Sequence, residues 1–136
     1  MKCRFVKTTN VYILWRNHIL LIKRSQFDES LAGVWESPGG HVDYPIVLGD
    51  SFPTRQEALR EVKEEAGLDL DLGRLQLYTI DRKNCHVAYI YDISTTSPPP
   101  VKLSFEHSHF RWTSCKSSLR LRLRKEVFNF VRKMCK

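Results

Sequence analysis

The chain has 136 residues, a net charge of +7 and 42% hydrophobic residues. This length predicts one domain, residues 1–136, with its own core, and the composition excludes a disordered chain. No apolar run approaches the ~20 residues of a membrane span, and no segment has the pattern of a signal peptide, so we expect a cytoplasmic protein without membrane contact.

The first half of the sequence predicts short strands followed by one helix. Strands rich in β-forming residues are expected over residues 2–15, 19–23, 34–36 and 41–43, with a polar loop at 25–33. The helix is expected to start near Thr54, which has capping-box spacing to Glu57. Gly67 stands where a helix C-cap is expected.

The second half predicts a return to strands and then a helix. Strands are expected over residues 70–81, 85–93 and 109–113, with a Ser/Thr/Pro loop at 94–100. The segment from Leu119 is ambiguous, because residues 119–124 alternate with period two while the apolar residues from 123 to 134 have helical spacing. Its length favours a C-terminal helix.

The cysteines and histidines show no metal-binding motif. His107 and His109 are only two residues apart, and we predict that they flank a strand rather than bind metal. The four cysteines are far apart and form no Cys-x-x-Cys pair, which predicts free thiols in a reducing compartment; they are Cys3, Cys85, Cys115 and Cys135.

The most informative segment is residues 60–68, Arg-Glu-Val-Lys-Glu-Glu-Ala-Gly-Leu. Glu61, Glu64 and Glu65 are spaced i, i+3 and i+4, which places them on one helix face about 5–6 Å apart. Like charges at this spacing destabilise a helix unless a cation lies between them, and Mg²⁺ is held in proteins by carboxylates and substrate phosphates. The segment alone also fits a solvated acidic surface.

This segment resembles the second half of the Nudix box, the signature of the Nudix hydrolases. Every defined position is matched from Arg60 to Leu68. Three further segments resemble the family in the expected order: the strand at 20–24, the Trp-x-x-Pro-Gly-Gly segment at 34–43 and the Glu-to-Trp segment at 106–112. The resemblance implies an α/β/α sandwich with a mixed β-sheet between helices.

The first half of the box departs from the family pattern. Ile46 and Phe52 occupy the positions where the family usually has a glycine and a glutamate. If Gly40 is the box glycine, the loop to Arg60 is six residues longer than usual. Gly49-Asp50 would then replace the Gly-Glu pair of the family.

The resemblance also implies the residues of a site. The implied metal ligands are the carbonyl of Gly40 and the carboxylates of Glu61, Glu64, Glu65 and Glu106, with Glu106 as ligand or general base. Arg60 is expected to orient the carboxylates, and Arg24 to meet substrate. Asp50 and Glu57 are further candidates. The implied cofactor is Mg²⁺, for which Mn²⁺ substitutes.

The implied activity is hydrolysis of a phosphoanhydride in a nucleoside diphosphate-linked substrate. The segment at 35–40 is most similar to MutT-type enzymes, which convert a nucleoside triphosphate, in some members an oxidised one, to monophosphate and pyrophosphate. Residues 101–136 carry ten Lys or Arg against two Glu, so removal of 5′ phosphates or a cap from RNA is an alternative. A non-catalytic nucleotide- or RNA-binding domain is another, and a homodimer remains open.

Overall fold

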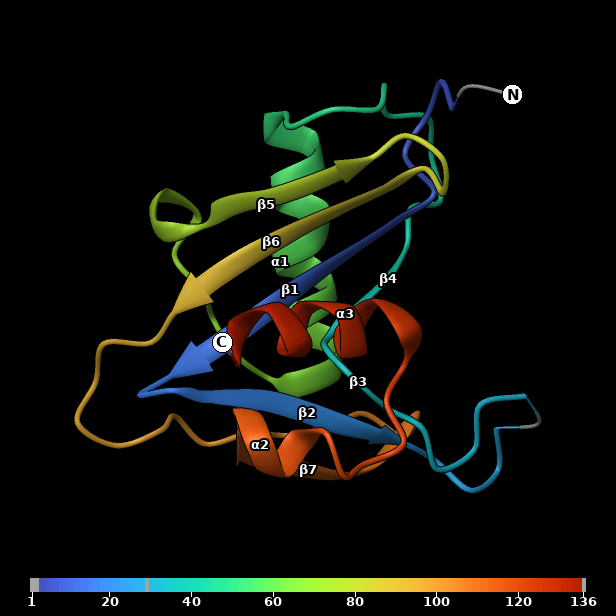
Figure 1. The fold of residues 1–136 in the computed structure, drawn as a ribbon. Helices are drawn as coiled ribbons and strands as arrows, with labels where there is room; N and C mark the ends of the chain where they lie inside the picture. The colour runs from blue at the N-terminus through green and yellow to red at the C-terminus, as the bar shows by residue number, and fades with distance from the viewer. Residues whose placement is uncertain (1–2, 29, 136) are drawn as a thin grey trace.

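The computed structural model describes residues 3–28 and 30–135, and within them a mixed seven-stranded sheet lies between helices (Figure 1). The strands are β1 (Thr8–Trp15), β2 (His18–Arg24), β3 (Trp35–Glu36), β4 (Gly39–His41), β5 (Gln76–Asp81), β6 (His86–Asp92) and β7 (His107–Ser114). The helices are α1 (Phe52–Ala66), the short 3₁₀ helix η1 (Leu72–Arg74), α2 (Cys115–Ser118) and α3 (Lys125–Met134). The predicted α/β/α sandwich is confirmed.

The sheet has β1 at its centre. Its order is β3-β2-β1-β6-β5, with β4 paired to β1 and β7 paired to β2. The pairing of β1 with β6 is parallel, and the other strand pairs are antiparallel. The pairing of β4 with β1 sets Gly40 opposite Thr9. This pairing fixes the Gly-Gly segment against the first residues of β1.

Two apolar layers hold the helices on opposite faces of the sheet, because side chains alternate along each strand. Val11 and Ile13 of β1 pack in the layer that includes Ala58 and Val62 of α1. Tyr12, between them in sequence, packs in the other layer, which includes Val127, Phe130 and Val131 of α3. The amphipathic face of each helix is therefore fixed against a different side of β1.

The start of α1 differs from the sequence expectation. The N-cap is Ser51, whose side chain accepts a hydrogen bond from the Thr54 backbone N–H at 3.3 Å. Thr54 itself is fully buried inside the first turn. The predicted capping box at Thr54 and Glu57 is therefore wrong, because the serine three residues earlier supplies the cap and Pro53 occupies the first turn, where its missing N–H costs nothing. The predicted C-cap is confirmed, since Gly67 has φ 69°.

Several predicted strands are shorter in the structure. The first strand begins at Thr8 rather than residue 2, and the strand expected over 70–81 begins at Gln76, after η1. The C-terminal helix begins at Lys125, because Trp35 forms a one-residue parallel bridge with Leu123 and accepts a hydrogen bond from the Arg124 N–H at 3.0 Å. This strand-like pairing lies at the end of the segment with the period-two pattern, and the residues before it form turns.

The prediction of free thiols is wrong. The structure contains two disulfides, Cys3–Cys85 and Cys115–Cys135, with Cα–Cα distances of 5.3 and 5.6 Å. The first joins the segment before β1 to the residue just before β6, and the second joins α2 to the residue just after α3. Neither disulfide could be predicted from the sequence, because the paired cysteines are 82 and 20 residues apart and form no sequence motif.

Within the described residues, no helix is both long enough and apolar enough to cross a bilayer.

Candidate metal-binding active site

Helix α1 presents a cluster of carboxylates around one arginine. The guanidinium of Arg60 donates to Glu57 at 2.6 Å, to Glu64 at 2.6 Å and to Glu61 at 2.8 Å. These contacts require the carboxylates to share a face, as their spacing predicted. They raise the pKa of Arg60 further above its ordinary value, with the hydrogen bond to Glu57 as the largest cause. Arg60 thus neutralises part of the acidic face.

Glu65 lies one helical turn after Glu61 and points toward the sheet. Its side chain is nearly fully buried, and its Oε1 accepts a hydrogen bond from the Gly39 backbone N–H at 2.8 Å. Burial raises the pKa of Glu65 to about 8, and the negative charges of Glu36, Glu61 and Glu106 act in the same direction. Burial also raises the pKa of Glu61. For both carboxylates the effect of burial outweighs the hydrogen bonds that favour the charged form, from Arg60 to Glu61 and from Gly39 to Glu65.

Gly40 lies directly against Glu61. A Cβ atom placed on Gly40 would come within 2.5 Å of Glu61 Oε2 and 2.6 Å of its Cδ. Because Glu61 has a flexible side chain, a Cβ at Gly40 would push its carboxylate away from β4. The absence of a side chain at Gly40 therefore lets the backbone of the Gly-Gly segment lie against the carboxylates of α1.

The facing wall is built from β2, β3 and the segment entering β7. Glu36 of β3 accepts a hydrogen bond from His107 at 2.7 Å, and it lies 3.3 Å from Arg24 Nε and 3.4 Å from Arg124 Nη1. Arg24 Nη1 also lies 3.7 Å from Glu106. This wall therefore combines carboxylates with two guanidinium groups.

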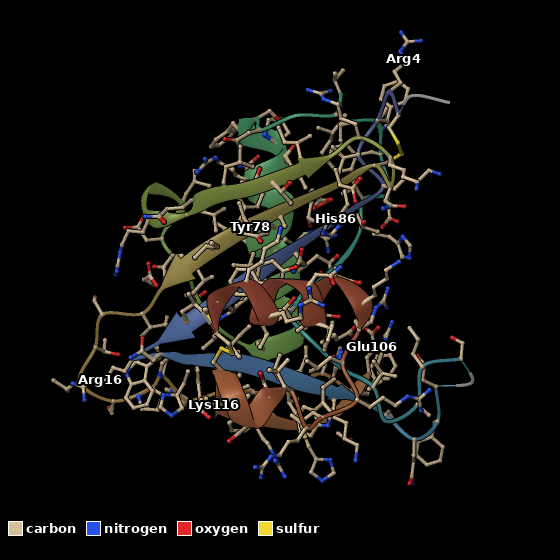
Figure 2. All side chains as sticks on the ribbon, viewed as in Figure 1. Arg4, Arg16, Tyr78, His86, Glu106 and Lys116 are labelled. Carbon is tan, nitrogen blue, oxygen red and sulfur yellow. A yellow bond between two sulfur atoms is a disulfide. The ribbon has the colours of Figure 1, made fainter. Side chains whose placement is uncertain are left out.

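A cleft of about 700 Å³ separates these walls. Such a volume suits a small-molecule ligand of nucleotide size. Glu106, just before β7, and His86, at the start of β6, both line it (Figure 2). The lining also includes Arg24, Glu36, Gly39, Gly40, Arg60, Glu61, Glu64, Glu65, Arg124, Lys125, Glu126 and Asn129.

The structure brings together most of the residues predicted for the site. Arg24, Gly40, Arg60, Glu61, Glu64, Glu65 and Glu106 all line the cleft. Glu57 is buried behind Arg60, and Asp50 lies at the other end of α1, paired with Arg55 at 2.8 Å and with the Tyr89 hydroxyl at 2.9 Å. Neither Glu57 nor Asp50 is among the described residues that line the cleft.

Sequence reasoning missed Glu36, Arg124 and His107. Glu36 stands inside the recognised Trp-x-x-Pro-Gly-Gly segment, but that segment by itself does not show which way the side chain points. His107 was expected to flank a strand, and it is the first residue of β7. Its buried contact with Glu36 depends on the placement of β3 and β7 beside β2, which spacing along the chain does not reveal.

The chemistry of the donor set fits a hard divalent cation. Carboxylate oxygens from α1 and from Glu106 face one space, where burial first and the neighbouring carboxylates second raise the pKa of Glu65. Oxygen-rich sites of this kind suit Mg²⁺ or Mn²⁺. A bound cation would relieve the repulsion among these groups.

Comparisons with known proteins agree with this geometry. The family model of the NUDIX domain matches residues 4–134. A MutT Nudix hydrolase structure from Burkholderia pseudomallei is 26% identical with a TM-score of 0.64, covering 95% of this chain and 96% of that chain. A MutT protein from Methanosarcina mazei is 24% identical with a TM-score of 0.64, covering 96% and 93%.

An Ap4A hydrolase from C. elegans is 22% identical with a TM-score of 0.63, covering 95% of this chain and 96% of that chain. No curated protein matches the sequence at a significant level. The family match spans nearly the whole chain and includes both walls of the cleft. Nudix hydrolases use a divalent metal, as the donor set here also indicates. The chain belongs to the Nudix domain family and is a Nudix pyrophosphohydrolase.

Proposed function

We propose that the protein, acting as one domain, uses Mg²⁺ to hydrolyse a nucleoside triphosphate to a monophosphate and pyrophosphate. The observation that carries this proposal is the convergence of four carboxylates, Glu61, Glu64, Glu65 and Glu106, on one cleft that also holds arginines. A triphosphate needs both features, because its phosphates require cationic partners and its metal ions require oxygen ligands.

The metal ligands in this proposal are the carbonyl of Gly40 and the four carboxylates. When bound, the metal supplies charge neutralisation and lowers the pKa of a coordinated water. Glu106 acts as a ligand or as the base that accepts a proton from that water. Its position beside Arg24 supports a role at the edge of the metal cage rather than at its centre.

Arg24 and Arg124 are the proposed contacts for substrate phosphates. Both guanidinium groups line the cleft, and both contact Glu36 on the wall opposite α1. A guanidinium can donate two hydrogen bonds to a phosphate, which fixes orientation as well as charge. Arg60 instead holds the carboxylates of α1 in place, since its three donor groups already face them.

We favour a nucleoside triphosphate as the substrate because of the names of the solved structures that are similar to this chain. Three of the matched structures have MutT in their names, and one of them is 26% identical to this chain. A neighbour named as an Ap4A hydrolase and another named as a bifunctional NMN adenylyltransferase/ADP ribose pyrophosphatase define the competing substrates. The second of these has 16% identity, and the aligned region is 43% of its length.

The test is a comparison of kcat/KM across normal and oxidised nucleoside triphosphates, ADP-ribose, a dinucleoside tetraphosphate and 5′-triphosphorylated RNA. The proposal predicts the highest value for a triphosphate and a loss of at least about 100-fold in Glu64→Gln, which removes a ligand charge at nearly constant shape. Lys63→Gln, on the neighbouring position of α1, is the matched control, because Lys63 pairs with Asp69 outside the cleft.

Turnover of RNA alone would replace this proposal with 5′-end processing. Near-normal activity in Glu64→Gln would contradict the assigned metal site.

A further inference from the structure

Glu36 lies between two arginines on the wall of the cleft that faces α1. Its Oε2 is 3.3 Å from Arg24 Nε, and its Oε1 is 3.4 Å from Arg124 Nη1. Arg24 ends β2 and Arg124 immediately precedes α3, so one carboxylate of β3 connects two elements that are far apart in the chain. Each oxygen of this carboxylate faces a different guanidinium group, which sets the separation of the two groups.

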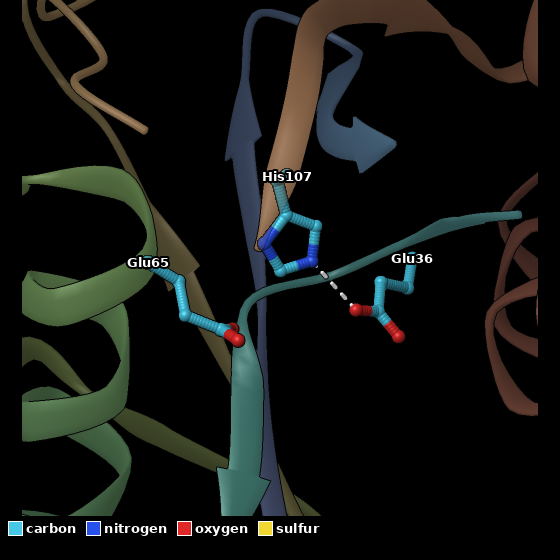
Figure 3. A group of neighbouring side chains, drawn as sticks. All are labelled: Glu36, Glu65 and His107. Atoms are coloured by element: carbon cyan, nitrogen blue, oxygen red, sulfur yellow. Dashed lines mark hydrogen bonds and ion pairs between the residues drawn. The ribbon is translucent and has the colours of Figure 1, made fainter. Parts of the chain in front are cut away.

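The carboxylate of Glu36 is itself held by a buried histidine. The side chain of His107 is fully buried, and its Nε2–H donates to Glu36 Oε2 at 2.7 Å. Figure 3 shows this ring nitrogen directed at Glu36. The backbone of Glu36 is also paired with Ile22 of β2 in the sheet. The position of Glu36 is therefore set by β2, β3 and β7 rather than by the arginines.

The contacts of Glu36 with the arginines are longer than those on α1. Arg60 donates to three carboxylates of α1 at 2.6 to 2.8 Å, which occupies its donors. Arg24 Nε, in contrast, is buried without a hydrogen-bond partner among residues 3–28 and 30–135, although Glu36 lies 3.3 Å away. Buried donors are nearly always paired. Charge attraction thus orients Arg24, while its donors stay available for a ligand.

Without Glu36, the two guanidinium groups face a different set of partners across the cleft. Arg24 Nη1 already lies 3.7 Å from Glu106, one of the carboxylates proposed as metal ligands. Opposite charges attract strongly in a partly buried cleft, so guanidinium groups released from Glu36 would turn toward these carboxylates. They would then leave their places for substrate phosphates. We propose that Glu36 is a positioning residue, which holds Arg24 and Arg124 apart and ready for neighbouring phosphates of the substrate.

This role deepens the proposed function and rests on it through Arg24 and Arg124, the proposed phosphate contacts. Glu36 acts only through the two arginines and touches no substrate atom. An arginine that is fixed before the ligand arrives loses less side-chain freedom on binding, so preorganisation strengthens the binding of a phosphate pair. A single phosphate contacts fewer of the fixed groups and gains less.

The test is titration calorimetry of the full chain with Mg²⁺ and methylenediphosphonate, two linked phosphonate groups that resist hydrolysis. Glu36→Gln keeps the shape of the side chain and removes its charge. Its Kd for methylenediphosphonate should rise at least about tenfold, by analogy with the loss of residues that orient metal ligands. Its Kd for methylphosphonate, which has one phosphonate group, should change less than about threefold.

The direction of this change separates positioning from net charge. Removal of a negative charge from an anion site should by itself strengthen anion binding, whereas loss of positioning weakens it. Asp43→Asn is the matched control, because Asp43 is an exposed carboxylate in the same cleft and pairs with neither arginine in the described part of the chain. Its Kd for methylenediphosphonate should stay the same or fall.

A double-mutant cycle with Arg124→Gln supplies a readout that a purely structural role of Glu36 would not move. If Glu36 acts through Arg124, the two substitutions remove part of the same interaction. The loss of affinity in the double variant should then be smaller than the product of the two single losses. Losses that multiply would overturn the inference, because Glu36 would then act independently of Arg124.

The outcomes distinguish the inference from the proposed function. An unchanged or lower Kd for methylenediphosphonate in Glu36→Gln, or an equal rise for methylphosphonate, would overturn the inference and leave the proposed hydrolysis intact. Failure of the unmodified protein to bind methylenediphosphonate with Mg²⁺ would overturn both. If Glu36→Gln does not fold, ¹⁵N relaxation of the arginine Nε–H groups in the unliganded protein decides: Arg24 and Arg124 side chains as rigid as the backbone support the inference, and disorder of either overturns it.

Discussion

Replacing Glu65 with glutamine should stabilise the metal-free protein. The pKa of this carboxyl is about 8 in the folded protein against 4.5 for an ordinary glutamate. At pH 7 the Glu65 carboxyl is ionised in the unfolded chain, whereas in the folded protein it keeps its proton. At about 1.4 kcal/mol for each pH unit from 4.5 to 7, the folded state is disfavoured by about 3 kcal/mol. Glutamine removes this cost and keeps an oxygen for the Gly39 N–H.

The sign of the pH dependence is fixed by the same values. Because the folded pKa lies above the unfolded one, the free energy of unfolding of the metal-free protein falls as the pH rises from 4.5 through 8. Glu65→Gln lacks this decline. Its advantage should thus be under about 1 kcal/mol at pH 5 and reach about 3 kcal/mol at pH 7.

Urea unfolding with EDTA at both pH values measures these differences. Glu64→Gln is the control, because its side chain is 57% exposed and its removal should change stability little. With saturating Mg²⁺ the order should reverse, since metal binds and stabilises the wild-type protein more strongly. A Glu65→Gln protein no more stable than the wild type at pH 7 in EDTA would refute the reasoning, as would an equal gain from Glu64→Gln.

Three further predictions concern the metal face, the disulfides and the helix cap. Gly40→Ala should fold but bind Mg²⁺ at least about tenfold more weakly by calorimetry, because its Cβ displaces the end of the Glu61 side chain; an unchanged affinity would count against the placement of β4. Non-reducing peptide mapping should recover Cys3 linked to Cys85, and replacing both by serine should lower the free energy of unfolding by up to about 4.5 kcal/mol, from the 82-residue separation. Recovery of free thiols in the unreduced protein would contradict the pairing. Ser51→Ala should cost about 1 kcal/mol in urea unfolding through loss of the α1 cap, and no loss would show that the cap lies elsewhere.

The sequence was sufficient to predict the features that depend on local spacing. The carboxylate face of α1 follows from a period of 3.6 residues, and the alternation of Val11, Tyr12 and Ile13 between two layers follows from a period of two. The Gly67 cap follows from the left-handed conformation that glycine adopts readily. Each of these is decided within a few residues of the chain.

Features that depend on tertiary placement were missed. The buried contact between Glu36 and His107 joins residues 71 positions apart, and the Cys3–Cys85 disulfide joins residues 82 apart. Asp50 was expected near the carboxylates because Gly49-Asp50 was taken to replace the Gly-Glu pair of the family. In the structure Asp50 lies at the far end of α1. There it pairs with Arg55, a residue one turn into the same helix.

The most direct test of the central claim is phosphorus NMR of one purified nucleoside triphosphate with the protein and Mg²⁺. The account predicts that monophosphate and pyrophosphate appear in equal amounts, at a rate that falls to background when EDTA is added. Release of orthophosphate and a nucleoside diphosphate would contradict the proposed bond cleavage. If the measurement is repeated with a triphosphate of each base and all of them stay intact, the result would contradict the proposed substrate class.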